Sequence, residues 1–346
     1  MSVPVIISDE QVKKIITWPI VNEAVEEAFK AICCSADFAW LRKHNKESSA
    51  DQPARTRTNI NNINNHGLLF TMPGFVSNYT LNSKKYSTLG CKMVTMFKEN
   101  EKRNPPLPSI LANIALFNSE TGQLECIIDG TEITAWRTAA ASVIATKYLY
   151  FKRKNYIKEP IVAIIGCGVQ GKSHSLGLCH TFPIKSIQLW NRTTEKAFSL
   201  LNCLESEKEN FINKNINITV FSSIDDCVRN ADIIVTSTYV DEPIIHFNML
   251  KKDVHINAVG CGPTSHHVEL SQKIYDKSIL YIDHWAGASV ELKDLKCNIV
   301  CEVGEAIIDQ TKIPEEGISI FQSLGMAVED VTTAQALYEA FKKQCE

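Results

Sequence analysis

A glycine-rich hexad in the middle of the chain has the residue types and spacing that bind a dinucleotide. It reads Gly166-Cys-Gly168-Val-Gln-Gly171 and directly follows the apolar run at residues 161–165, which is typical of a buried parallel strand. The first glycine permits a tight turn, the second lets the backbone approach a pyrophosphate, and the third allows close helix–strand packing. Amide groups at the start of the helix that follows then bind phosphate oxygens. A turn without function is the competing interpretation, but the strand before it and a second strand at the expected distance favour the dinucleotide.

The end of that second strand carries the residues that distinguish the two nicotinamide dinucleotides. A site that prefers NAD usually places Asp or Glu there, whereas this chain reads Trp190-Asn191-Arg192-Thr193-Thr194. A carboxylate would repel a 2′-phosphate, but the guanidinium of Arg192 can bind one through two hydrogen bonds. Arg192, with Asn191 and Thr193, therefore favours NADPH, with NADH as the weaker alternative. The competing interpretation is an ordinary surface arginine in a loop.

The elements that must position these residues follow from the hydrophobic pattern. Apolar runs alternate with helical or turn segments after residue 160, which predicts a doubly wound, largely parallel sheet. Its further strands are expected at residues 186–190, 218–221, 233–236, 255–258 and 279–282.

The first part of the chain has a different pattern. Strand-like runs separated by turn residues predict a meandering antiparallel sheet. These runs lie at residues 68–72, 91–97, 110–117 and 124–128. Helices are expected within residues 9–36, 132–151 and 328–343, and the polar, asparagine-rich stretch 45–67 is expected to form an exposed turn or hairpin tip.

Length and composition bound the function. The 346 residues favour two domains, and 45% hydrophobic residues are enough for a real core. A net charge of −3 gives no strongly basic face, so nucleic acid is not an expected partner. We find neither a secretory profile nor an uncharged membrane span, and we expect a soluble cytoplasmic protein. The 12 cysteines contain no C-x-x-C pair, so we interpret them as reduced and structural, with no metal site.

The chain resembles the ornithine cyclodeaminase and mu-crystallin family, and its mu-crystallin branch in particular. The matching segments run in one order along most of the chain: Gln52-Pro-Ala-Arg-Thr56, Met72-Pro73, Lys92-Met-Val-Thr95, Asp129-Gly130, Ile133-Thr-Ala-Trp-Arg-Thr-Ala-Ala140, the hexad, residues 190–193, His255-Ile-Asn-Ala-Val-Gly260 and Ser323-Leu-Gly-Met-Ala-Val-Glu-Asp330. The resemblance implies a Rossmann-type doubly wound domain over about residues 136–309. It also implies an α+β domain, made of residues 1–135 and about 310–346, that binds substrate and forms a homodimer.

The resemblance also implies which residues bind the cofactor and the substrate. The cofactor-lining positions would be Ser109, Arg137, Thr138, Gly166, Gly168, Val169, Gln170, Gly171, Asn191, Arg192, Thr193, Ser237, Thr238, Val259 and Leu324. Arg55 would hold a substrate carboxylate, a task that suits a guanidinium, and Met72 would line the same site. Lys92 would lie beside the reacting carbon, where it relays a proton or holds the carboxylate. Without the resemblance, Arg55 and Lys92 would read as solvated surface charges.

The sequence departs from the cyclodeaminases of the family at two carboxylates. They have an aspartate shortly after the Asn-Ala-Val-Gly segment, whereas here no carboxylate follows Gly260 before Glu269. They also have a glutamate before the Met-Pro pair, where this chain has Thr71. We therefore expect NADPH-dependent reduction of a cyclic ketimine carboxylate rather than cyclisation of ornithine.

Three matters stay open at this point. The chain could instead bind a thyroid hormone or another amino-acid-like ligand without turnover, or aminate a 2-oxo acid as alanine dehydrogenase-like members do. His266 and His267 follow a glycine–proline turn and could exchange protons near neutral pH. Exposed loop histidines are the competing interpretation of that pair.

Overall fold

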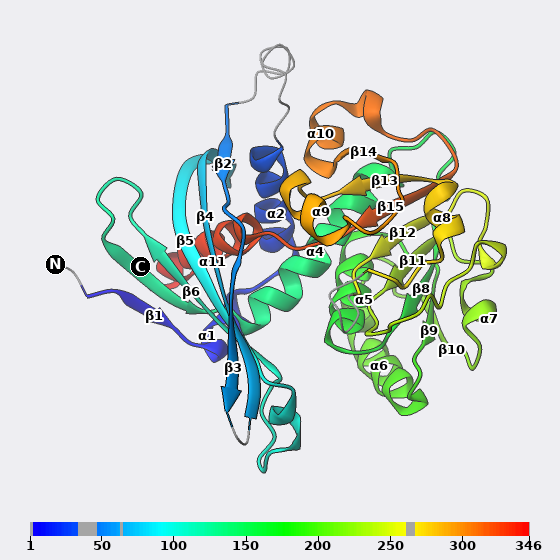
Figure 1. Ribbon diagram of the computed structural model, residues 1–346, viewed down its shortest axis with the longest axis horizontal. Helices are drawn as coiled ribbons and strands as arrows, with labels where there is room; N and C mark the ends of the chain where they lie inside the picture. The colour runs from blue at the N-terminus through cyan, green and yellow to red at the C-terminus, as the bar shows by residue number, and fades with distance from the viewer. Residues whose placement is uncertain (1–2, 34–46, 63–64, 261–266, 346) are drawn as a thin grey trace. The chain divides into compact units, whose positions relative to one another are not determined.

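The chain forms two compact units that share one continuous helix. The computed structural model describes residues 3–33, 47–62, 65–260 and 267–345 (Figure 1). Unit 1 comprises the residues through Arg137 together with those from Gly325 onward, and unit 2 comprises Thr138–Leu324.

Unit 1 is built on a mostly antiparallel sheet. Its spatial order is β1-β7-β6-β5-β4-β2, with β3 paired to the remaining edge length of β4. The strands are β1 (Val5–Ile7), β2 (Ser49–Asp51), β3 (Thr56–Asn62), β4 (Asn65–Leu81), β5 (Lys84–Met96), β6 (Ile110–Phe117) and β7 (Leu124–Asp129). The predicted meander over residues 68–128 is thus confirmed, and the asparagine-rich stretch contributes β3, which pairs antiparallel with β4.

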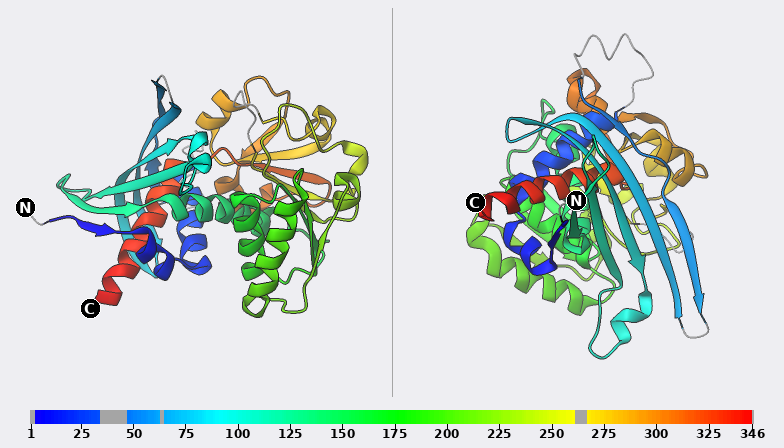
Figure 2. Two further views of the ribbon diagram at one scale, coloured as in Figure 1. Left: turned by 90° about the horizontal axis from the view of Figure 1, so that it is seen from below. Right: turned by 90° about the vertical axis from the view of Figure 1, so that its left-hand side faces the viewer.

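Helices pack on the sheet of unit 1 and enclose its core. They are α1 (Asp9–Ile15), α2 (Trp18–Ile32) and the C-terminal α11 (Ala327–Cys345), of which α2 and α11 pack on β4 (Figure 2). The one helix expected within residues 9–36 is two helices, because a proline at the second residue of α2 fits only the first turn of a helix. A capping box between Ser8 and Gln11 starts α1.

Unit 2 is a parallel sheet of eight strands in the order β10-β9-β8-β11-β12-β15-β13-β14. The strands are β8 (Ile161–Ile165), β9 (Ser186–Trp190), β10 (Asn217–Val220), β11 (Ile233–Thr236), β12 (His255–Ala258), β13 (Ser278–Ile282), β14 (Ile299–Glu302) and β15 (Ile318–Gln322). The helices are α4 (Thr131–Leu149), which enters from unit 1, then α5 (Val169–Thr181), α6 (Thr194–Glu207), α7 (Ile224–Val228), α8 (Gln272–Asp276), α9 (Trp285–Glu291) and α10 (Val303–Ile308). This order confirms the Rossmann-type doubly wound fold.

Both faces of the parallel sheet are buried. Alternate residues of β8 show this, because Val162 and Ile164 pack into one apolar cluster, and Ala163 and Ile165 pack into another. The first cluster includes residues of α5 and α6, and the second includes residues of α7 and α8. Burial on both faces explains why these strands read as continuous apolar runs.

The structure differs from the sequence-based boundary between the domains near the C-terminus. We placed residues from about 310 onward with the N-terminal domain, but β15 pairs in parallel with β12 and β13 in unit 2. All five residues of β15 are buried, so the segment needs both neighbouring strands and both faces covered. The chain therefore returns to unit 1 only at Gly325. Within the described residues, no helix is long and apolar enough to cross a membrane.

Candidate functional site

The glycine-rich turn of unit 2 has no room for side chains at two of its glycines. Gly166 has a φ of +104°, and a Cβ there would lie 2.7 Å from the carbonyl oxygen of Ser237. A Cβ on Gly171 would lie 1.9 Å from the carbonyl oxygen of Gly166. Gly168 differs, because nothing lies within 4 Å of its Cβ position, and it caps the N-terminus of α5. The turn therefore leaves open space where the backbone of the second glycine would approach a phosphate.

Asn191 fixes the turn to the end of β9. Its side-chain oxygen accepts a hydrogen bond from the Cys167 N–H at 2.9 Å, and its amide nitrogen donates to the Thr193 carbonyl at 2.8 Å. The backbone N–H of Gly166 also donates to the Trp190 carbonyl at 2.9 Å. These hydrogen bonds therefore fix the glycine-rich turn relative to the residues that are predicted to bind the ribose.

A cavity of about 360 Å³ lies beside this turn and brings many of the predicted cofactor residues together. Its lining includes Gly166, Gly168, Asn191, Arg192, Thr193, Ser237 and Thr238. Lys196, in the first turn of α6, also lines it and was not predicted. Its signal was its place in the first turn of the helix that directly follows Arg192 and Thr193. Two exposed cations, Arg192 and Lys196, thus border one cavity.

The carboxylate of Glu269 holds together the chain segments that follow β11 and β12. One oxygen accepts hydrogen bonds from the N–H and the hydroxyl of Thr238, both at 2.6 Å. The other accepts from the Thr236 hydroxyl at 2.7 Å and from the Gly260 N–H at 2.8 Å. Burial raises the pKa of Glu269, and its four donors oppose that rise. Nothing in the sequence singled out this residue, whose partners lie up to 33 positions away.

Ser237 is hydrogen-bonded within the cavity lining, and the remaining predicted cofactor residues lie outside that lining. Ser237 donates its hydroxyl to the Gly166 carbonyl at 3.0 Å, and the Val259 N–H donates to the Thr236 carbonyl at 2.9 Å. Leu324 is buried, and its N–H donates to Asp283 at 2.7 Å. Val169 is 70% exposed on the first turn of α5, Gln170 follows it, and Thr138 is half-buried on α4. Ser109 and Arg137 belong to unit 1.

Two of the predicted substrate residues of unit 1 face each other across its sheet. Met72 on β4 pairs with Lys92 on β5. Arg55 lies outside the strand pairing, one residue before Thr56, which begins β3 and pairs with Thr71. Residues directly opposite each other on antiparallel strands have side chains on the same face. Met72 and Lys92 therefore share the buried face, whereas Arg55 is exposed in the segment between β2 and β3.

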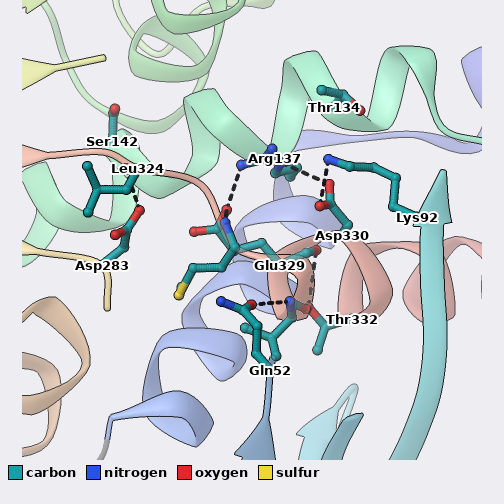
Figure 3. Close-up of polar contacts among 12 residues, drawn as sticks. Gln52, Lys92, Thr134, Arg137, Ser142, Asp283, Leu324, Glu329, Asp330 and Thr332 are labelled. Carbon is teal, nitrogen blue, oxygen red and sulfur yellow. Dashed lines mark hydrogen bonds and ion pairs between the residues drawn. The ribbon is translucent and has the colours of Figure 1, made fainter. Parts of the chain in front are cut away.

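Lys92 is buried in a cluster of four charged side chains (Figure 3). Its side chain is 1% exposed, and Nζ lies 2.6 Å from Asp330 Oδ2. Arg137 Nε donates to the other oxygen of Asp330 at 2.9 Å, and Arg137 Nη1 donates to Glu329 at 2.8 Å. Burial lowers the pKa of Lys92 to about 8. Two cations and two anions balance in formal charge, which permits the cluster to be buried.

A tether joins the segment of Arg55 to the helix that carries Asp330. The side-chain oxygen of Gln52 accepts a hydrogen bond from the Val328 N–H at 3.0 Å (Figure 3). Val328 is in the first turn of α11, where backbone N–H groups have no partner within the helix. The sequence-based prediction missed Gln52, Glu329 and Asp330 as site residues, although all three lie in the segments that carry the family resemblance.

His267 is not the exposed loop histidine of the competing interpretation. It is 7% exposed, its Nδ1 lies 3.0 Å from the Gly260 carbonyl oxygen, and its Nε2 lies 3.2 Å from Glu291. The Gln322 amide nitrogen lies 3.1 Å from Nδ1. That interpretation failed because these three partners come from separate segments that converge beyond the sheet. His266 lies outside the described residues, as do residues 261–265.

The arrangement in unit 2 fits a dinucleotide. The open space at Gly168 accommodates a pyrophosphate near the N-terminus of the 13-residue helix α5, whose dipole favours anions. The cavity between the ends of β9 and β11 is bordered by two cations and hydroxyl groups, which suits a phosphorylated ribose. Among the described residues, no group of histidine, cysteine or carboxylate side chains could hold a metal ion.

Comparisons with known proteins extend over nearly the whole chain. A family model described as the ornithine cyclodeaminase/mu-crystallin family matches residues 20–344. The rat protein named ketimine reductase mu-crystallin is 32% identical over 296 residues, which cover 84% of this chain and 85% of its own.

Two solved structures resemble the whole fold. An archaeal alanine dehydrogenase dimer with bound NAD has a TM-score of 0.78 and 26% identity, with 99% of this chain and 97% of that chain covered. The Delta(1)-pyrroline-2-carboxylate reductase of Thermococcus litoralis, in complex with NADH and L-proline, has a TM-score of 0.77 and 27% identity, with 99% and 98% covered.

Proposed function

The chain belongs to the ornithine cyclodeaminase/mu-crystallin family, and from that premise we propose that it reduces cyclic ketimine carboxylates with NADPH. It is an oxidoreductase of C=N groups that uses a nicotinamide dinucleotide. The observation that carries the finer proposal is the pairing of Met72 with Lys92, whose ammonium is buried against Asp330, with Arg55 directly before the strand β3 of the same sheet. A cyclic imino acid has a carboxylate, which a guanidinium can bind, and an imine nitrogen, which an ammonium can protonate.

The cofactor supplies the hydride when it is bound, and residues of unit 2 would hold it. Backbone amides at Gly168 and Val169 would bind the pyrophosphate at the start of α5. Arg192 and Lys196 would bind the 2′-phosphate, and the absence of a carboxylate among the lining residues of the cavity supports NADPH over NADH. Ser237, Thr238 and Val259 lie at the ends of β11 and β12, at the carboxyl edge of the sheet where ligands of such folds bind.

Residues of unit 1 would bind and protonate the substrate. Arg55 would form a two-point ion pair with the carboxylate attached to the C=N carbon, and so fix the orientation of the ring. The ammonium of Lys92 would give a proton to the imine nitrogen, which makes the carbon more electrophilic. Hydride addition to that carbon would convert the C=N double bond into the C–N single bond of a cyclic amino acid. Met72 would contribute apolar surface beside the ring.

Reductive amination of a 2-oxo acid is the second candidate function. An archaeal alanine dehydrogenase at 26% identity is among the structures with the same fold, and that name favours this alternative. The same Arg55 and Lys92 would bind a 2-oxo acid, but ammonia or an amine would be needed as a further substrate. Binding of a thyroid hormone without turnover would also use Arg55 for the carboxylate.

We also propose a homodimer through the outer face of the sheet of unit 1. Met93 and Leu111 are 39% and 38% exposed. Met93 follows the inward-facing Lys92 on β5 and therefore points to the outer face, as does Thr95 two residues later. Leu111 on β6 pairs with Thr95 and so lies on the same outer face. Apolar side chains on an open sheet face are typical of a subunit interface. Light scattering coupled to gel filtration measures the mass, and a monomer at micromolar concentration would exclude this dimer.

The test is turnover of purified protein with NADPH and either a five- or a six-membered cyclic ketimine carboxylate. Loss of reduced-nicotinamide absorbance without ammonia, faster with NADPH than with NADH, is the expected result. Turnover of the 2-oxo acid only when ammonia is added would support reductive amination instead. Tight NADPH binding without turnover of any ring size would support a ligand-binding role.

A further inference from the structure

We propose that Asp330 is a positioning residue that keeps Lys92 in its charged form and in one orientation. The inference rests on the proposed function, because it gives Lys92 its part in protonating the substrate. It adds a residue of α11 to a site whose other substrate residues come from β4, β5 and the segment before β3.

Lys92 and Asp330 make a short, buried contact. Lys92 and Asp330 are separated by more than half of the chain, yet Nζ and Oδ2 lie 2.6 Å apart, and the side chains are 1% and 0% exposed (Figure 3). A lysine ammonium is a compact charge on a flexible stem of four carbons. Burial without a counter-ion would strongly disfavour its charged form. The single short contact therefore selects both the direction of the stem and its protonation state.

Asp330 is itself held in place by Arg137. Its second oxygen accepts the Nε–H of Arg137 at 2.9 Å, and Arg137 Nη1 is bound by Glu329, the neighbouring residue on α11. The carboxylate therefore has one oxygen for each cation. Because the guanidinium is planar and bound at two points, the carboxylate oxygen that faces Lys92 has little freedom to turn.

Three charged side chains surround Lys92 and act on its pKa. Asp330 and Glu329 face it from α11, and Arg137 faces it from α4. Burial lowers the pKa of Lys92 most, Asp330 opposes that fall, Arg137 adds to it, and Glu329 opposes it more weakly. Without the charge of Asp330, burial and Arg137 would both act to remove the proton from Lys92. Asp330 thus keeps Lys92 protonated at neutral pH. The pKa of Lys92 nevertheless stays close to neutral, which suits a residue that donates a proton.

The experiment measures the protonation of Lys92 directly. Protein labelled with ¹³C at the lysine ε-carbon is titrated by NMR, and the Lys92 resonance is assigned by its loss in Lys92→Arg. In Asp330→Asn we expect the midpoint of this titration to fall by at least one pH unit. In Glu329→Gln, which leaves Asp330 in place, we expect a smaller shift. An unchanged midpoint in folded Asp330→Asn would overturn the proposal.

The kinetic arm uses Asp330→Glu, which keeps the charge but lengthens the arm. We expect its Lys92 midpoint to stay within about half a pH unit of wild type, with kcat at least tenfold lower and KM for NADPH unchanged. Unchanged kcat in Asp330→Glu would overturn the positioning role, also in the case that Asp330→Asn does not fold. Because the titration requires no substrate, it stands even if the protein reduces no ketimine, which separates failure of this inference from failure of the proposed function.

Discussion

Gly171 lies so close to Gly166 that a Cβ on Gly171 would be 1.9 Å from the Gly166 carbonyl oxygen. The turn can therefore reverse direction between β8 and α5 only while position 171 has no side chain. Gly168 meets no such restriction from the protein, and its φ of −82° is accessible to any L-residue. The two glycines thus serve different purposes: Gly171 is required for packing of the turn, and Gly168 leaves space for the ligand.

That difference predicts opposite effects for two matched substitutions. Gly171→Ala should destabilise the protein by about 1–3 kcal/mol or more, because backbone rather than a flexible side chain opposes the new methyl group. Gly168→Ala should change the free energy of unfolding by less than about 0.5 kcal/mol. It should nevertheless weaken NADPH binding at least tenfold, because the methyl group fills the space for the pyrophosphate. Urea unfolding and fluorescence titration with NADPH measure the two quantities. NADPH affinity at the wild-type level in Gly168→Ala would show that the pyrophosphate binds elsewhere.

Discrimination between the two cofactors should depend on Arg192 and Lys196. Each charge-assisted hydrogen bond to a phosphate contributes about 1.5–3 kcal/mol. Arg192→Ala should therefore raise the Kd for NADPH roughly 10- to 100-fold and leave that for NADH within about threefold. Lys196→Ala should act in the same direction with a smaller effect, since an ammonium makes one contact where a guanidinium makes two. Isothermal titration with both dinucleotides measures the four constants.

The control for this pair is Lys152→Ala, an exposed cation after α4 that does not line the cavity. It removes the same net charge and should affect both dinucleotides equally. If Arg192→Ala weakens NADPH and NADH to the same extent, the 2′-phosphate is not bound by Arg192. A decrease restricted to Lys196→Ala would transfer that role to α6.

The sequence predicted an element correctly where the constraints that determine that element act between residues close together in the chain. The hexad was identified because its constraints act within one turn, and the strands at residues 161–165 and 233–236 were identified because full burial gives continuous apolar runs. β14 was missed because only its last two residues are buried. β15 was missed because the polar residues Ser319 and Gln322 interrupt its apolar run, although all five of its residues are buried.

The same distinction applies to the site. Arg55 and Lys92 were found through the family resemblance, whereas Asp330 became visible only through its contact with a residue on another element. Glu269 shows the same limit, since its importance lies in four donors from the segments that follow β11 and β12. A single carboxylate in a sequence reads as a solvated charge until its partners are known.

Stability should decline as the pH falls from about 6.5 toward 4, in part because of His174. This imidazole is buried on α5, where Nδ1 lies 2.7 Å from the Gln170 carbonyl and Nε2 lies 2.9 Å from the Ser142 hydroxyl. Burial lowers the pKa of His174 to about 4, whereas an unfolded histidine titrates near about 6.5. Between these values the unfolded chain binds the extra proton, so the free energy of unfolding falls by up to about 1.4 kcal/mol per pH unit.

Urea unfolding across pH 4.5–7.5 checks this, with His174→Gln as the test. The variant should lose that part of the slope and keep the part contributed by His255, whose pKa burial lowers to about 3. The control is His246→Gln, because that side chain is exposed and should leave the slope intact. An identical slope in wild type and His174→Gln would mean that folding does not lower the pKa of His174.

The role of Arg55 can be separated from the general effect of positive charge in the same segment. Arg57, two residues later on β3, is also exposed, and its Nε donates to the Asn59 side chain, which makes it a matched control. Arg55→Ala should raise KM for a cyclic ketimine carboxylate about 10- to 100-fold, the equivalent of one charge-assisted pair, whereas Arg57→Ala should leave it unchanged. A cyclic imine without the carboxylate should be reduced slowly and equally by wild type and Arg55→Ala, because it has no group for Arg55 to bind. Steady-state kinetics with both imines measure this. A loss in Arg55→Ala that is as large for the imine without the carboxylate as for the carboxylate would place Arg55 in the structure of the segment that Gln52 tethers to α11, and not on the substrate.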